Sequence, residues 1–125
     1  MTQEQLGEAL KFWQSALRLK DWDITAEIVR RHKMSNRTHF GEVSWNLSRM
    51  SAKILISDEI DTGESDDIPF DPEQTLVHEL VHLHVAKIGE VEGNPSWVEE
   101  QVVDQIANAF VGLHRVLPHG KPREV

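Results

Sequence analysis

Residues 71–87 read DPEQTLVHELVHLHVAK, and this stretch decides the fold. Asp71, Pro72 and Gln74 are typical of a helix start, because aspartate caps the first free N–H groups and proline fits the first helical position. Apolar residues cover most of the circumference of the expected helix: Leu76, Val77, Leu80, Val81 and Leu83. A helix with that pattern is buried in the centre of a protein. The stretch therefore predicts a central helix that runs to about Lys87.

The same helix carries His78 and His82, with Glu79 beside the first of them. Side chains at i and i+4 project from one helix face, so both imidazoles can bind one ion. Catalytic zinc takes three protein ligands and a water, and a neighbouring carboxylate can take the proton of that water. Histidines on a buried helix also need polar partners. The pattern predicts one Zn²⁺ ion at His78 and His82, with Glu79 as the catalytic general base.

A second helix is expected over residues 97–114, and two adjacent acids near its start compete for the position of third ligand. Ser96 and Glu99 fit a capping box, which gives Glu99 a local role at the helix start. Glu100 precedes Asp104 by one turn, and a carboxylate so placed can accept the free N–H of a ligating histidine. We therefore expect Glu100 to be the third metal ligand, with Asp104 behind a histidine. The alternative for these acids is a solvated helix face.

The arrangement His78-Glu79-x-x-His82 followed by Glu100-x-x-x-Asp104 resembles the gluzincin metallopeptidases, the thermolysin-like branch of the zincins. The short chain is similar to their minimal single-domain versions from bacteria and phages. The resemblance implies one zinc ion on the two histidines and Glu100, Glu79 as general base, and Asp104 behind a histidine ligand. It implies hydrolysis of a peptide bond in a peptide or protein substrate through a zinc-activated water.

The resemblance also implies that an extended substrate pairs with a sheet edge beside the metal. The strand from Ala52 to Ser57 is the expected edge, because it is the last strand before the metal-bearing helix. Gluzincins usually add a Tyr or His that stabilises the oxyanion, and this chain has no Tyr. The sequence does not choose among the remaining histidines, which are His32, His39, His84, His114 and His119. Two alternatives therefore stay open: a zinc-binding regulatory or interaction module with weak or no catalysis, and a helical interaction domain without metal.

The first half of the chain predicts a helix and a small sheet. Thr2 and Gln5 form a capping box before an amphipathic helix over residues 3–19. Alternating apolar residues predict strands at 22–28, 43–47 and 52–57, the last two joined as a hairpin, and seven acidic residues mark a surface loop over 58–71. The fold class we expect is α+β and zincin-like, with the N-terminal helix and an antiparallel sheet packed on two metal-bearing helices.

Size and charge narrow the class of protein further. With 125 residues, we expect one zincin-like domain over residues 1–125. A net charge of −8 argues against nucleic acid and anionic membranes as partners. The absence of Cys excludes disulfides and thiolate ligands. With no signal-peptide pattern and no apolar run of membrane-spanning length, we expect a cytoplasmic protein. The sequence indicates neither the oligomeric state nor the substrate.

Overall fold

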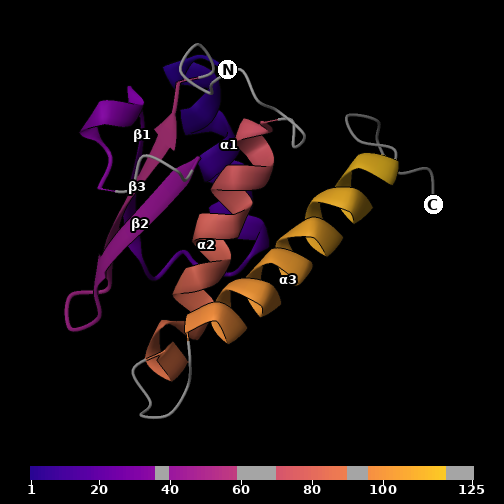
Figure 1. Cartoon of the computed structure of the whole chain (residues 1–125). Coiled ribbons are helices and arrows are strands. Elements are labelled where there is room, and N and C mark those ends of the chain that lie inside the picture. Colours follow the sequence, from indigo (N-terminus) through magenta and orange to yellow (C-terminus); the bar gives the residue numbers. More distant parts are fainter. Residues whose placement is uncertain (36–39, 59–69, 90–95, 118–125) are drawn as a thin grey trace.

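The computed structural model describes residues 1–35, 40–58, 70–89 and 96–117, and these form an α+β arrangement of three helices and a small sheet (Figure 1). In chain order the elements are α1 (Gln3–Ala16), β1 (Asp23–Val29), the 3₁₀ turn η1 (Arg31–Lys33), β2 (Gly41–Asn46), β3 (Ser51–Ser57), α2 (Pro72–Gly89) and α3 (Ser96–Val116). The expected acidic loop falls mostly on residues 59–69, outside the described residues. The tail beyond residue 117 and the connection at 90–95 also lie outside them.

The sheet is mixed, with the strand order β1-β3-β2. The hairpin is confirmed, since β2 pairs antiparallel with β3 from Gly41↔Ile56 to Asn46↔Ser51. The prediction of an antiparallel sheet was wrong for β1, which pairs parallel with β3. β3 takes the central place because it carries the most deeply buried side chains of the sheet, Ile54 and Ile56, and a strand paired on both sides suits such a sequence.

This strand order corrects the expected substrate-pairing edge. The strand from Ala52 to Ser57 has β1 on one side and β2 on the other, so its backbone is already paired along its length. The strand edge beside α2 belongs to β2 (Figure 1). The sequence alone could not reveal this, because the order of strands in space depends on which strand buries the most apolar surface.

Helix α2 lies between the sheet and α3, as the sequence predicted for a central helix (Figure 1). Its start is capped by Asp71, whose Oδ1 accepts a hydrogen bond from the Gln74 backbone N–H at 3.2 Å. Its buried apolar residues are Leu76, Val77, Leu80, Val81, Leu83 and Ala86. Burial of each larger apolar side chain contributes roughly 1.5–3 kcal/mol, so this helix contributes much of the core.

Helices α1 and α3 pack on α2 from different sides. The capping box of Thr2 and Gln5 at the start of α1 is confirmed, and Leu6 and Trp13 bury its inner face. On α3 the buried residues recur one turn apart: Val103, Ala107 and Val111. None of the helices within the described residues has the length and apolar character that a membrane crossing needs.

An ionic clamp fixes the far end of α3 to the start of α2. The Arg115 guanidinium donates to both carboxylate oxygens of Asp71, at 2.7 and 3.1 Å, and to Glu73 at 3.0 Å. The indole N–H of Trp13 on α1 donates to the second oxygen of Glu73 at 3.0 Å. The clamp therefore links all three helices, and it fixes the end of α3 beside the start of α2, so the two helices lie antiparallel.

Candidate metal centre

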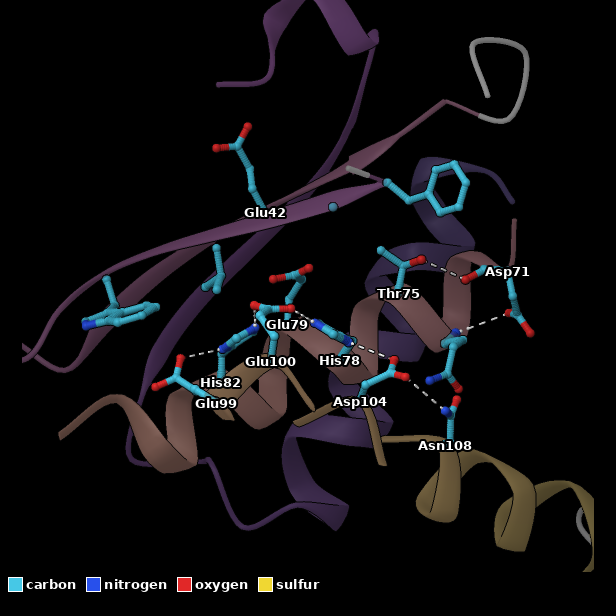
Figure 2. Close-up of a pocket in the computed structure, with 15 residues that line it drawn as sticks. Glu42, Asp71, Thr75, His78, Glu79, His82, Glu99, Glu100, Asp104 and Asn108 are labelled. Carbon is cyan, nitrogen blue, oxygen red and sulfur yellow. Dashed lines mark hydrogen bonds and ion pairs between the residues drawn. The ribbon is translucent and has the colours of Figure 1, made fainter. Parts of the chain in front are cut away.

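Three side chains from α2 and α3 converge on one point (Figure 2). Nε2 of His78 lies 3.2 Å from one oxygen of Glu100, and Nε2 of His82 lies 2.8 Å from the other. One ligand atom from each of the three residues lies within 4.8 Å of the others, so the three residues could hold a single metal ion. Two imidazoles and one carboxylate suit zinc and other first-row transition metals. The structure thus brings together the three residues that the sequence singled out as ligands.

The local structure explains this convergence. His78 and His82 are one turn apart on α2, and their ring centroids are 5.0 Å apart. Glu100 lies near the start of α3, which crosses α2 on the side of these rings (Figure 2). The two helices are antiparallel neighbours, so the start of α3 faces the later part of α2. One carboxylate can therefore reach both imidazoles.

A carboxylate also lies behind each histidine. Oδ1 of Asp104 is 3.4 Å from Nδ1 of His78, where the sequence placed Asp104 behind a histidine ligand. Oε2 of Glu99 is 3.0 Å from Nδ1 of His82, a contact that sequence reasoning missed because it gave Glu99 only a capping role. The signal was available in the short connection between the helices. A short connection makes them antiparallel, so His82, the histidine nearer that connection, faces the first residues of α3.

Glu79 lies beneath β2, next to Gly41. It is 7% exposed, and its pKa is raised to about 8, first by burial and then by repulsion from Glu100 and Glu42. A divalent cation at the neighbouring ligands would oppose both effects and favour the carboxylate form. Glu79 is therefore a buried acid whose carboxylate form a cation at this position would stabilise.

Gly41 is what allows β2 to approach Glu79 so closely. A Cβ at this position would lie 2.5 Å from Cγ2 of Thr75 and 3.1 Å from Oε2 of Glu79. The first distance is below any ordinary van der Waals contact, so another residue fits only if the Thr75 side chain, the strand or the helix shifts. Sequence analysis did not single out Gly41, because nothing in the local pattern distinguishes a glycine at a close approach from one at a strand end.

The converging side chains lie in a cleft of about 680 Å³ between β2, α2 and α3. Its described lining includes six carboxylates and neither Lys nor Arg: Glu42, Asp71, Glu79, Glu99, Glu100 and Asp104. This charge favours a bound cation. The lining also contains neutral hydrogen-bonding side chains, Gln74, Thr75 and Asn108.

The edge of β2 also borders the cleft. The Ser57 backbone N–H donates to the Phe40 carbonyl at 2.8 Å, so Phe40 and Ser57 form a hydrogen-bonded pair of the antiparallel ladder. The next pair, Gly41 and Ile56, is then a non-hydrogen-bonded pair. Because paired residues alternate between hydrogen-bonded and non-hydrogen-bonded pairs, the backbone groups of Gly41, Val43 and Trp45 point away from β3. All three residues line the cleft.

The described histidines outside the motif lie elsewhere. His84 contacts the Leu17 carbonyl through Nε2 at 2.7 Å, on the α1 side of α2, as expected for a residue two positions after His82. The ring of His114 packs on Phe12 and Trp13, with centroids 4.8 and 5.0 Å apart. His32 is exposed on η1. None of these three lines the cleft, and His39 and His119 lie outside the described residues.

Comparison with known proteins gives no family for this chain: no protein-family model, curated protein or solved structure matches it.

Proposed function

We propose that the protein is a zinc-dependent metallopeptidase with a zincin-like fold, in which His78, His82 and Glu100 hold one Zn²⁺ ion. The observation that carries this proposal is the convergence of these three side chains beside the buried carboxylate of Glu79. A structural zinc site is closed by four protein ligands and needs no buried acid next to it. A site with three ligands and an adjacent acid suits hydrolysis by an activated water.

The chemistry divides between the ion and the chain. When bound, zinc lowers the pKa of a coordinated water toward about 7 and polarises the scissile carbonyl. Glu79 accepts the proton of the attacking water on its carboxylate and delivers it to the nitrogen of the leaving amine. The cover provided by β2 keeps bulk water from this carboxylate, and Gly41 leaves the space in which it lies.

The open edge of β2 is the proposed docking site of the substrate. An extended peptide can add to this edge through the backbone groups of Gly41, Val43 and Trp45, in the manner of β-strand addition. Such a peptide would pass along the cleft in front of the metal ligands. This replaces β3, the edge expected from the sequence, with the neighbouring strand.

A zinc-binding regulatory module is the second candidate. It is favoured by the absence of Tyr from the chain and by the position of the three described non-motif histidines away from the cleft. The described lining thus contains no Tyr, and no His other than the two proposed ligands, that could stabilise the oxyanion. On this reading the site binds metal without hydrolysis.

Glu79→Gln separates the two functions. Gln retains the shape of the side chain but cannot accept a proton, so we expect the variant to keep its zinc and to lose hydrolysis by at least about 100-fold. The measurement is cleavage of a broad peptide library by the zinc-loaded protein, followed by mass spectrometry, with zinc content measured in parallel. Glu27→Gln on the exposed face of β1 is the matched control. Unchanged cleavage by Glu79→Gln would exclude Glu79 as the base, and a wild type that cleaves nothing would favour the regulatory module.

A further inference from the structure

We propose that Glu99 is the main positioning residue of the metal centre and orients His82 more strongly than Asp104 orients His78. This inference rests on the proposed metal ligands and is independent of whether the site hydrolyses peptides. It departs from the gluzincin resemblance, which places the orienting role on Asp104 alone.

The two carboxylate–histidine contacts differ in length. The Glu99 Oε2 to His82 Nδ1 distance is 3.0 Å, a normal hydrogen-bond length. The Asp104 Oδ1 to His78 Nδ1 distance is 3.4 Å, at the long limit of such a bond. The other oxygen of Asp104 also accepts a hydrogen bond from the Asn108 side chain at 3.3 Å, so this carboxylate is shared.

The two contacts also differ in exposure to water. The side chains of His82 and Glu99 are 8% and 17% exposed, whereas those of His78 and Asp104 are 19% and 58% exposed. Water and salt screen the exposed pair, and they screen the buried pair much less. A charge-assisted hydrogen bond is also stronger in a site of low dielectric constant. The buried contact should therefore hold its histidine more rigidly.

The contact of Glu99 with Nδ1 of His82 leaves Nε2 on the side of the converging ligand atoms. If an ion is bound through Nε2 of His82, the proton of the neutral ring lies on Nδ1, and Glu99 is placed to accept that N–H. Nε2 is the atom that lies 2.8 Å from Glu100, inside the group of converging ligand atoms. Glu99 therefore holds His82 in the ring orientation that metal binding needs, and with an ion in place it stabilises the tautomer that binds through Nε2.

The position of Glu99 in the chain makes this arrangement possible. It directly precedes the ligand Glu100 in the first turn of α3, so the two side chains differ by about 100° around the helix axis. Figure 2 shows the consequence: Glu99 and Glu100 approach His82 from two sides, one at each ring nitrogen. The imidazole of His82 is thus held between two consecutive acids of α3.

The test is a zinc titration of four variants, with the dissociation constant measured by competition with a chromogenic chelator. We expect Glu99→Ala to weaken zinc binding by about 10- to 100-fold. The fold-loss of zinc affinity in Asp104→Ala should be smaller than that in Glu99→Ala by a factor of at least about three. Glu99→Gln keeps an acceptor oxygen of the same reach and should recover part of the loss. Gln105→Ala, an exposed substitution on α3, should leave the constant unchanged.

A second readout separates orientation from a general effect on folding. Co²⁺ in place of zinc gives a visible absorption spectrum that reports ligand geometry, and Glu99→Ala should change this spectrum while Asp104→Ala changes it less. Circular dichroism of each variant checks that the helices remain. The proposal is overturned if Asp104→Ala weakens zinc binding as much as Glu99→Ala, if Glu99→Ala matches Gln105→Ala, or if the wild type binds no zinc. Absence of peptide cleavage would count against the proposed hydrolysis only.

Discussion

At the scale of single residues, the candidate metal centre depends on Gly41, which has no side chain and so lets β2 lie close to α2. The sequence identified Glu79 as an acid beside two histidines, but its burial beneath β2 arises from Gly41, which lies far from it in the chain. Contacts of this kind cannot be predicted from periodicity, because they follow from how closely two elements approach. The role of Glu99 was missed for a different reason: a capping role already accounted for this residue, and the antiparallel packing of α2 and α3, which brings it to His82, was not used.

Gly41→Ala should therefore disturb the site more than an ordinary glycine substitution. The added Cβ must displace Thr75 or Glu79, and overpacking of this kind costs about 1–3 kcal/mol of unfolding free energy. Peptide cleavage should fall with it, because Glu79 moves, while the metal ligands on α2 and α3 keep their positions. Urea unfolding of the metal-free protein measures the loss of unfolding free energy, and zinc content shows whether the proposed ligands keep their positions.

Gly112→Ala is the matched control for this substitution. A Cβ at Gly112 meets nothing within 4 Å, and Gly112 lies on the exposed face of α3. Alanine is the better helix former there, so this variant should be stabilised by up to about 1 kcal/mol. If Gly41→Ala is as stable and active as Gly112→Ala, then β2 does not position Glu79 in the way we describe.

At the scale of elements, the helices were largely predictable and the sheet was only partly so. Apolar periodicity and capping residues predicted α1, α2 and α3 close to their observed bounds, because these signals are local. The hairpin of β2 and β3 was also predictable, since its two strands are adjacent in the chain. The parallel pairing of β1 with β3 was not, because it joins segments separated by a long connection and is selected by burial of the whole sheet.

The clamp between α3 and α2 gives a prediction at this scale. Arg115→Met removes the bonds to Asp71 and Glu73 and should lower the unfolding free energy at pH 7 by roughly 1 kcal/mol. Lys11→Met, an exposed substitution on α1, is the control for loss of one positive charge. Because the clamp also sets the position of α3, zinc affinity should decrease slightly in Arg115→Met and remain unchanged in the control.

The effect of Arg115→Met should depend on pH in a defined direction. Hydrogen bonds from Arg115 are the largest cause that lowers the pKa of Asp71 below its ordinary value of 3.8. The folded protein therefore binds this proton less readily than the unfolded chain, so the contribution to stability is fully present above that value and is lost as the pH falls below it. Unfolding curves of wild type and Arg115→Met should converge as the pH drops below 3.8. If the difference in unfolding free energy between wild type and Arg115→Met stays constant as the pH falls below 3.8, this explanation of the clamp is wrong.

At the scale of the whole molecule, the candidate metal centre forms only because separate parts of the chain come together. Two of the proposed ligands come from α2, the third from α3, and the cover from β2. The sequence could name the three residues that converge, because the motif spacing and the Glu100–Asp104 pair are local patterns. It could not name the cover or the substrate-pairing edge, because these depend on the strand order.

The metal content of the purified protein tests the central claim most directly. The protein is prepared without a His tag, dialysed against buffer containing trace zinc, and analysed by elemental mass spectrometry. We predict about one zinc ion per chain in the wild type and in Gln101→Ala, an exposed neighbour of the third ligand, and almost none in His82→Ala and Glu100→Ala. Equal zinc in Glu100→Ala and wild type, or no zinc in the wild type, would contradict the proposed centre.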